Sequence, residues 1–350
     1  MKHTNRIVSL MLAATMLLVA GCSTADTSWG AEYKGEKAAV GIYIMGQLSS
    51  YNKAMSQVED PDKDPLKQDV DGVKGSEWVK ERTPVEMAKY FAIKERFEQA
   101  GLKLSDDQLA SLNELMSYQY GNMKDLYVKN GISEASLRDY YTNYYRSDSL
   151  FEKLYGPGGE REIPAADITK YFGENYRATK YIAVPKTDLE TQKALDEAGL
   201  AEAKKRAEGY LTAAQAQGAN FEDVIAQWEK DSSEDGTSPH EHTDDPDLHT
   251  VIVPKEGSNY PKEYMEALEK AEVGKPFMVE ASQYYFVGLK LDILSKPDYL
   301  ADAYKTTIRT ALKGEEFDQL LLDWGKEILP QVTFNDAAVK KYTANKLTFK

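Results

Sequence analysis

The chain has 350 residues, with 57 acidic and 43 basic side chains and a formal net charge of −14. A surface this acidic excludes nucleic acid as a partner and gives no overall attraction to anionic lipid. The chain has one cysteine, so no disulfide can form within it and its stability must come from packing.

The N-terminal segment has the pattern of a bacterial lipoprotein signal. Lys2 and Arg6 precede an apolar stretch over residues 7–20, which is short for a spanning helix. Small residues then precede Cys22, which in such signals is lipidated and becomes the first mature residue. We predict a signal peptide over residues 1–21 and an extracytoplasmic protein held on the cell membrane by acyl chains such as palmitate on Cys22. The alternative is an ordinary secretory signal or an N-terminal anchor helix.

A helical module is predicted after a short spacer. Residues 22–32 are mostly small and polar and form the predicted spacer, and residues 33–162 carry apolar side chains at helical spacing. Thr83–Glu86 matches a capping box with proline at the first helical position, which predicts a helix that begins there and ends at Gly101. Asp60–Gly75, rich in Asp, Lys, Pro and Gly, is a predicted loop.

Two more helices are predicted in this module. Ser105 and Gln108 form a second capping box, and Gly131 marks the end of that segment. Ser133 begins a helix with a stripe of tyrosines that includes Tyr140, Tyr141 and Tyr144. The stripe indicates either helix packing with solvated hydroxyls or a ligand site, and we predict packing.

A different pattern occupies residues 163–295 and predicts a small α+β domain. Its predicted elements are a strand at 179–184, helices at 195–217 and 221–230, an acidic loop at 231–247, a helix from 260 to 271, and strands at 277–279 and 284–291. A further helix, Asp298–Leu329, is predicted to pack back on the helical module, so that residues 296–350 complete it and the α+β domain is an insertion.

The chain resembles the extracytoplasmic foldase lipoproteins of the PrsA type and the SurA-like chaperones. The segments that carry the resemblance are 97–108, 130–139, 165–184, 218–226, 271–277 and 284–291. The resemblance implies an α+β fold in which a helical SurA-like chaperone module, completed by a C-terminal helix, carries an inserted parvulin-like peptidyl-prolyl isomerase domain.

The parvulin-like domain departs from the pattern of active isomerases, which have one histidine on the first strand and one on the last. Tyr181 stands at the first position, and Phe286 stands at the second, or Tyr285 if the register shifts by one residue. Rotation of an X-Pro bond has a barrier of about 18–20 kcal/mol, and an apolar pocket alone lowers it incompletely. We therefore assign no catalytic residue and predict a binding platform with weak or no isomerase activity.

A cleft is expected on this domain where active relatives bind proline. Its predicted lining is Tyr181, Tyr264, Met265, Leu268, Phe277 and Phe286. Aromatic side chains with polar tips suit repeated contact with unfolded chains, but each of these residues is equally compatible with an ordinary core position.

Three histidines follow the second helix of this domain. His240, His242 and His249 lie in one loop with Asp244, Asp245 and Asp247, which is compatible with a zinc or copper site or with a solvated acidic loop. No CxxC or HExxH motif accompanies them, so we predict the solvated loop and no metal or other cofactor.

Three classes of function remain. The first is a tethered chaperone or foldase whose partners are unfolded or partly folded secreted proteins. The second is an active prolyl isomerase, and the third is a solute-binding lipoprotein. Solute-binding proteins are built from repeated βαβ units, whereas the first 120 mature residues predict helices only, so we predict the first class.

Overall fold

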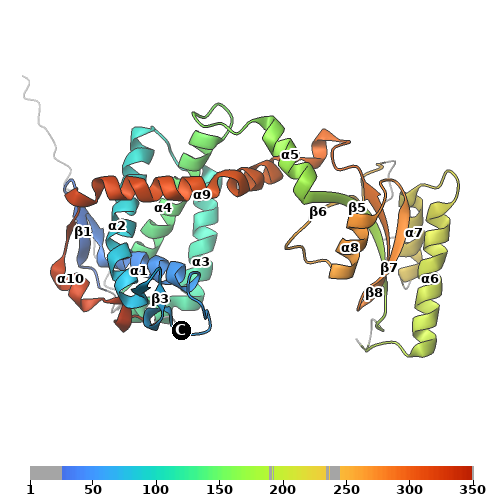
Figure 1. Ribbon diagram of the computed structural model, residues 1–350, viewed down its shortest axis with the longest axis horizontal. Coiled ribbons are helices and arrows are strands. Elements are labelled where there is room, and N and C mark those ends of the chain that lie inside the picture. The colour runs from blue at the N-terminus through green and yellow to red at the C-terminus, as the bar shows by residue number, and fades with distance from the viewer. Residues whose placement is uncertain (1–25, 189–190, 192, 234–235, 237–244, 349–350) are drawn as a thin grey trace, which may run out of the picture. The chain divides into compact units, whose positions relative to one another are not determined.

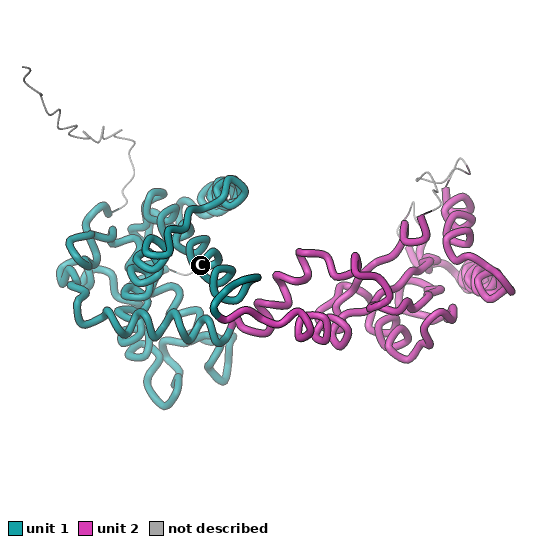
Figure 2. Tube along the Cα trace, turned by 90° about the horizontal axis from the view of Figure 1, so that it is seen from above, with its two compact units in different colours: residues 1–160, 315–350 teal, residues 161–314 magenta. Residues whose placement is uncertain are grey.

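The computed structural model describes residues 26–348 except 189–190, 192, 234–235 and 237–244. Cys22, His240 and His242 lie outside the described residues. The described chain forms two compact units, one made of the residues up to 160 and from 315 onward and the other of residues 161–314 (Figure 2). Helices and small antiparallel sheets make an α+β structure, which confirms the predicted fold class. Within the described ranges, no helix is long and apolar enough to cross a bilayer.

Helices dominate the first unit (Figure 1). They are α1 (Val40–Met55), α2 (Gly75–Gln99), α3 (Asp106–Lys129), α4 (Glu134–Tyr155), the C-terminal half of α9 (Asp302–Ile328) and α10 (Asp336–Lys341). Gly325 lets α9 lie against α2, because a Cβ there would stand 2.9 Å from the carbonyl oxygen of Val85 and the backbone nitrogen of Lys89. Ile328 enters the same core cluster as Met87.

A three-stranded sheet joins the two ends of this unit. β1 (Trp29–Tyr33) pairs with β2 (Glu36–Ala39) on one side and with β9 (Thr333–Phe334) on the other. The predicted spacer over residues 22–32 is therefore wrong at its C-terminal end. Ala31 and Tyr33 alternate into the core, and their burial fixes this segment as a strand.

The predicted start of the second helix is also wrong. α2 begins at Gly75, eight residues before Thr83, and Pro84 lies inside it. The Thr83 hydroxyl donates a hydrogen bond to the carbonyl oxygen of Val79, one helical turn earlier, instead of capping a new helix. The predicted loop before it contains η1 (Pro65–Lys67) and a hairpin of β3 (Asp69–Val70) and β4 (Val73–Lys74).

Other helix boundaries agree with the sequence. Ser105 and Gln108 form the predicted capping box of α3, and Ser133 caps α4. Gly101 and Gly131 follow α2 and α3 with φ angles of +65° and +82°, which other residues rarely adopt. These ends depend on short-range hydrogen bonds and on backbone freedom, which the local sequence specifies.

A four-stranded antiparallel sheet organises the second unit, in the order β6-β5-β8-β7. Its elements are α5 (Ala165–Asn175), β5 (Tyr176–Pro185), α6 (Glu197–Gln215), α7 (Phe221–Ser232), β6 (Val251–Pro254), α8 (Lys262–Lys270), β7 (Pro276–Glu280), β8 (Tyr284–Leu291) and η2 (Pro297–Tyr299). α6 and α7 cover one face and α8 the other (Figure 1). The edge strand β6 was not predicted, and residues 296–314 belong to this unit rather than to the helical one.

Candidate functional site

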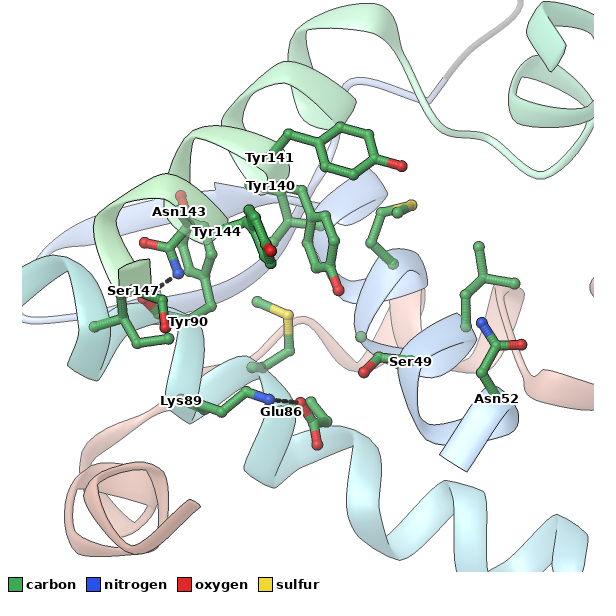
Figure 3. A pocket seen from close by; sticks show the side chains of 16 residues that line it. Ser49, Asn52, Glu86, Lys89, Tyr90, Tyr140, Tyr141, Asn143, Tyr144 and Ser147 are labelled. Atoms are coloured by element: carbon green, nitrogen blue, oxygen red, sulfur yellow. Dashed lines mark hydrogen bonds and ion pairs between the residues drawn. The ribbon is translucent and has the colours of Figure 1, made fainter. Parts of the chain in front are cut away.

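The first unit contains a cavity of about 440 Å³ between α1, α2 and α4. Its apolar lining includes Ile42, Met45, Leu48, Met87 and Ile93. Figure 3 shows the tyrosines of α4 on one side and polar groups of α1 and α2 on the other. Methionine side chains are flexible and polarisable, so such a wall adapts to apolar groups of different shape.

The tyrosine stripe of α4 both packs and lines this pocket. Tyr140, Tyr141 and Tyr144 recur at helical spacing, which points them from one face of α4 toward the cavity (Figure 3). Tyr144 is 58% exposed, whereas burial raises the pKa of Tyr140 to about 12. Tyr90 donates a hydrogen bond to Asp139 at 2.7 Å, and its pKa is raised, chiefly by burial. The lining phenols Tyr90 and Tyr140 are therefore neutral near pH 7 and offer apolar area with polar tips.

Two charged side chains that pair with each other line the pocket. Glu86 is buried, and Lys89 and Arg82 form ion pairs with it from the same helix. Glu86 and Lys89 both line the cavity (Figure 3). A carboxylate paired in this way does not present an isolated anion to a ligand. The pocket is therefore an apolar site with one neutralised polar end.

In the second unit, the six predicted cleft residues meet on the face of the sheet that α8 covers. Tyr264, Leu268 and Phe286 are almost fully buried, so they are core residues and not an accessible surface. Tyr181, Met265 and Phe277 are partly exposed at the edge of the same cluster. The structure thus brings the predicted set together, but only half of it is available to a partner.

Strand register decides which residue of β8 faces Tyr181. Ala183 lies opposite Phe286 and Tyr181 lies opposite Gly288, so Phe286 shares the face of Tyr181. The ring centroids of Tyr181 and Phe286 are 5.8 Å apart. Tyr285 points to the other face and packs with α6 and α7. The alternative register with Tyr285 at this position is therefore excluded.

Hydroxyl groups take part in this aromatic cluster. Tyr260 donates a hydrogen bond to the hydroxyl of Tyr181 at 3.3 Å, and the hydroxyls of Thr179 and Tyr264 are 2.8 Å apart. Burial, with a contribution from Tyr181, raises the pKa of Tyr260, so its hydroxyl stays protonated near pH 7. Sequence reasoning missed Tyr260, although its position just before Pro261 and α8 placed it beside this face.

The opposite face of the sheet holds a buried charge network. Lys180 of β5 contacts Glu222 of α7 at 2.5 Å. The ring of His249 lies between Glu222, at 2.6 Å from Nδ1, and Glu229, at 3.2 Å from Nε2. Burial opposes ionisation of Glu222, but hydrogen bonds from Lys180 and His249 outweigh it and lower the pKa of Glu222.

This network concerns the alternative in which the three histidines bind a metal ion. In the part of the chain that the structure describes, no group of three or more His, Cys, Asp or Glu side chains has the arrangement of a metal site. His249 instead joins the end of the acidic segment to α7. Its two ring nitrogens face the carboxylates of Glu222 and Glu229.

No family model and no curated protein matches the sequence. Solved structures do match the chain. A crystal structure of the foldase protein PrsA from Streptococcus pneumoniae is 16% identical, with 79% of this chain and 96% of that chain covered and a TM-score of 0.41. PrsA from Lactococcus lactis is 16% identical over 92% of this chain and 100% of that chain, with a TM-score of 0.38. A SurA-like chaperone of Campylobacter jejuni is 16% identical over 71% and 94%, with a TM-score of 0.23. These matches are to the protein types that the sequence resembles, PrsA foldases and SurA-like chaperones.

Proposed function

We propose that the protein is an extracytoplasmic chaperone or foldase that holds apolar segments of unfolded secreted proteins. The observation that carries this proposal is the open apolar pocket of the first unit, bordered by tyrosines. A cavity of about 440 Å³ accommodates a few side chains rather than a whole folded surface. Such a site suits short extended stretches of a client that is not yet folded.

The chemistry of the pocket favours reversible contact. Leu48 and Tyr141 line the pocket and are partly exposed, and the exposed ring of Tyr144 stays compatible with water when no client is bound. With Glu86 paired to Lys89 and Arg82, the pocket presents no isolated charge. Clients are then bound through apolar contact area and shape complementarity, which allows many different sequences to bind and dissociate.

The parvulin-like unit acts in this proposal as a second binding platform with weak or no isomerase activity. Its accessible aromatic edge is formed by Tyr181, Phe277 and the neighbouring Met265. The positions where active parvulins carry histidines hold Tyr181 and Phe286. A phenol and an aromatic ring support contact with a proline ring, but neither is an imidazole, the side chain whose ordinary pKa suits proton exchange near pH 7.

Membrane tethering through a lipidated Cys22 is part of the proposal and is supported by the signal pattern alone. Wild-type protein is expected to partition with membranes after export, whereas Cys22→Ala protein is expected to be released or to remain unprocessed at this site. The same mature N-terminus and membrane affinity in both proteins would contradict the tether.

The client-binding role is tested by filling the pocket. Ser49 lines the cavity, so Ser49→Trp places an indole in it. The matched control is Ser117→Trp, at an exposed position of α3 away from the pocket. We expect Ser49→Trp to reduce suppression of aggregation of an unfolded client severalfold, with Ser117→Trp close to wild type. Equal suppression by both variants would exclude the pocket as the client site.

The alternative function, an active prolyl isomerase, is separated by a second assay. Cis–trans exchange of a short proline peptide is expected to be barely faster with the protein than without it. Robust exchange that Tyr181→Ala abolishes would make the protein an enzyme and overturn the proposal of a binding platform.

A further inference from the structure

Three lysines gather at the C-terminal end of the first unit. Lys340 and Lys341 end α10, and Lys346 lies in the following turn η4 (Ala344–Lys346). The ammonium group of Lys346 donates to the carbonyl oxygens of Lys340, at 3.0 Å, and Lys341, at 3.5 Å. All three side chains are exposed. A chain with a net charge of −14 thus presents a compact group of positive charge, which we call the basic patch.

The basic patch lies beside the first described residue of the chain. The carboxylate of Asp26 accepts hydrogen bonds from Lys341 at 2.6 Å and from the hydroxyl of Tyr342 at 2.9 Å. Asp26 follows Cys22 by four residues, a span of at most about 14 Å when fully extended. A lipid on Cys22 therefore keeps the basic patch close to the membrane surface.

The patch retains charge for an external partner. Lys341 is paired with Asp26, but neither Lys340 nor Lys346 forms an ion pair with a carboxylate of the described residues. Residues 333–348 contain these three lysines and a single acidic residue, Asp336. Three lysines against Asp336 and Asp26 leave a local charge of +1, opposite in sign to that of the protein as a whole.

An aromatic residue with the character of a membrane-interface anchor lies by the N-terminal end of α10, the helix whose C-terminal end carries Lys340 and Lys341. Asn335, which caps α10, donates a hydrogen bond to the carbonyl oxygen of Trp29 at 2.8 Å. The indole of Trp29 is partly exposed, with the ammonium group of Lys37 at 5.3 Å from its ring centroid. Tryptophan is enriched at the headgroup level of a bilayer, and lysine is attracted to anionic headgroups.

We propose that the basic patch binds anionic phospholipid headgroups beside the tether and so fixes which side of the first unit faces the membrane. The inference rests on the tether at Cys22 that belongs to the proposed function. Attraction between lysines and an anionic surface falls off within a Debye length, about 8 Å at physiological ionic strength. The short link from Cys22 to Asp26 keeps the patch near that range, whereas the acidic remainder of the protein is repelled.

The single cysteine allows a direct test. The mature chain from Cys22 is coupled through its thiol to a maleimide lipid in vesicles of phosphatidylcholine, with or without phosphatidylglycerol. Lysines are then acetylated briefly with an amine-reactive ester and quantified by peptide mass spectrometry. We expect acetylation of Lys340 and Lys346 to be about threefold slower or more on anionic vesicles, with high salt removing the difference. The exposed Lys204 and Lys205 of the second unit are expected to react equally on both.

A paired variant shows whether the patch itself is responsible. Lys340→Gln with Lys346→Gln is expected to abolish the anionic-lipid protection of Lys341, whereas Lys204→Gln with Lys205→Gln leaves it intact. Equal acetylation on both vesicle types would overturn the proposal. The proposal would also be overturned if soluble glycerophosphate, added to neutral vesicles, protected the same lysines equally well. The patch would then be a site for free phosphate esters. Because the coupling is chemical, none of these outcomes depends on whether cells lipidate Cys22.

Discussion

The ammonium group of Lys180 lies 2.5 Å from a carboxylate oxygen of Glu222, with both side chains less than a tenth exposed. This contact joins the central strand β5 to α7 beneath the face that carries no predicted cleft residue. The backbone carbonyl of Pro246 accepts a further hydrogen bond from Lys180. The pair thus connects the sheet, the helix and the end of the acidic segment.

Removing one partner of this pair is expected to destabilise the second unit strongly. Lys180→Met leaves Glu222 buried without its lysine partner, and breaking a buried pair costs about 3–5 kcal/mol. The double variant Lys180→Met with Glu222→Leu is expected to recover much of that loss, since no buried charge is left. Urea unfolding measures both. The matched control Lys186→Met breaks the more exposed pair with Glu280 and is expected to cost about 1 kcal/mol or less.

Asp148 predicts a pH dependence of the first unit. Burial, with the nearby Glu152, raises the pKa of Asp148 to about 6 from an ordinary value of 3.8. A carboxyl group with a raised folded-state pKa contributes stability below about pH 4 and loses it as the pH rises through 6. Asp148→Asn is therefore expected to equal wild type near pH 4 and to be about 1–3 kcal/mol more stable at pH 7.

Unfolding of wild type and Asp148→Asn between pH 4 and pH 7 checks this expectation. The exposed Asp125 of α3 provides the matched control, and Asp125→Asn is expected to follow wild type across the range. A stability difference for Asp148→Asn that is constant with pH would contradict ionisation of Asp148 as its cause.

Restoring the histidines tests the parvulin-like face. Tyr181 and Phe286 lie on the same face with ring centroids 5.8 Å apart, so Tyr181→His with Phe286→His places two imidazoles within reach of each other. We expect a measurable gain in proline exchange, with some loss of stability because Phe286 is buried. The control Phe286→His with Tyr285→His puts the second imidazole on the opposite face and is expected to show no gain.

The two units are expected to differ in their ability to fold as isolated fragments. Residues 161–314 contain a complete sheet and its covering helices, so this fragment is expected to fold alone. Residues 26–160 lack β9 and the aromatic contact between Phe151 and Phe317, whose ring centroids are 5.3 Å apart. Without residues 315–348 we expect no cooperative transition by circular dichroism. A monomeric, cooperatively unfolding 26–160 fragment would show that the C-terminal segment is dispensable.

Local features of the sequence predicted local features of the structure. The box of Ser105 and Gln108 is formed by bonds within one turn, and Gly101 ends its helix through its own backbone freedom. Thr83 shows that a capping-box motif does not by itself prove a helix start. The same residues also occur inside a longer helix, where the threonine hydroxyl donates to a carbonyl oxygen one turn earlier. The pairing of β1 with β9 could not be predicted from residues 29–33 alone, since β9 lies about 300 residues away.

In the candidate sites too, the sequence predicted the local features and missed those that depend on packing between distant segments. Alternation along β5 and β8 placed Tyr181 and Phe286 on one face, which period-two geometry specifies. How deeply Tyr264 and Leu268 are buried depends on the packing of α8 on the sheet, which their spacing does not reveal. The pocket beside Tyr144 arises where three helices meet, and a pattern on one helix cannot distinguish a filled interface from an open one.

The pairing of β1 with β9 also sets an order of events during synthesis of the chain. β1 is made about 300 residues before β9, so the three-stranded sheet stays open until residues 333–334 have been added. The inserted unit is complete at residue 314. It can fold before the helices N-terminal to it have contacted the residues from 315 onward that complete their unit. A chain interrupted before residue 333 would then display a finished α+β unit attached to an unfinished helical one. Such a truncated chain would itself expose the apolar surface that a chaperone recognises.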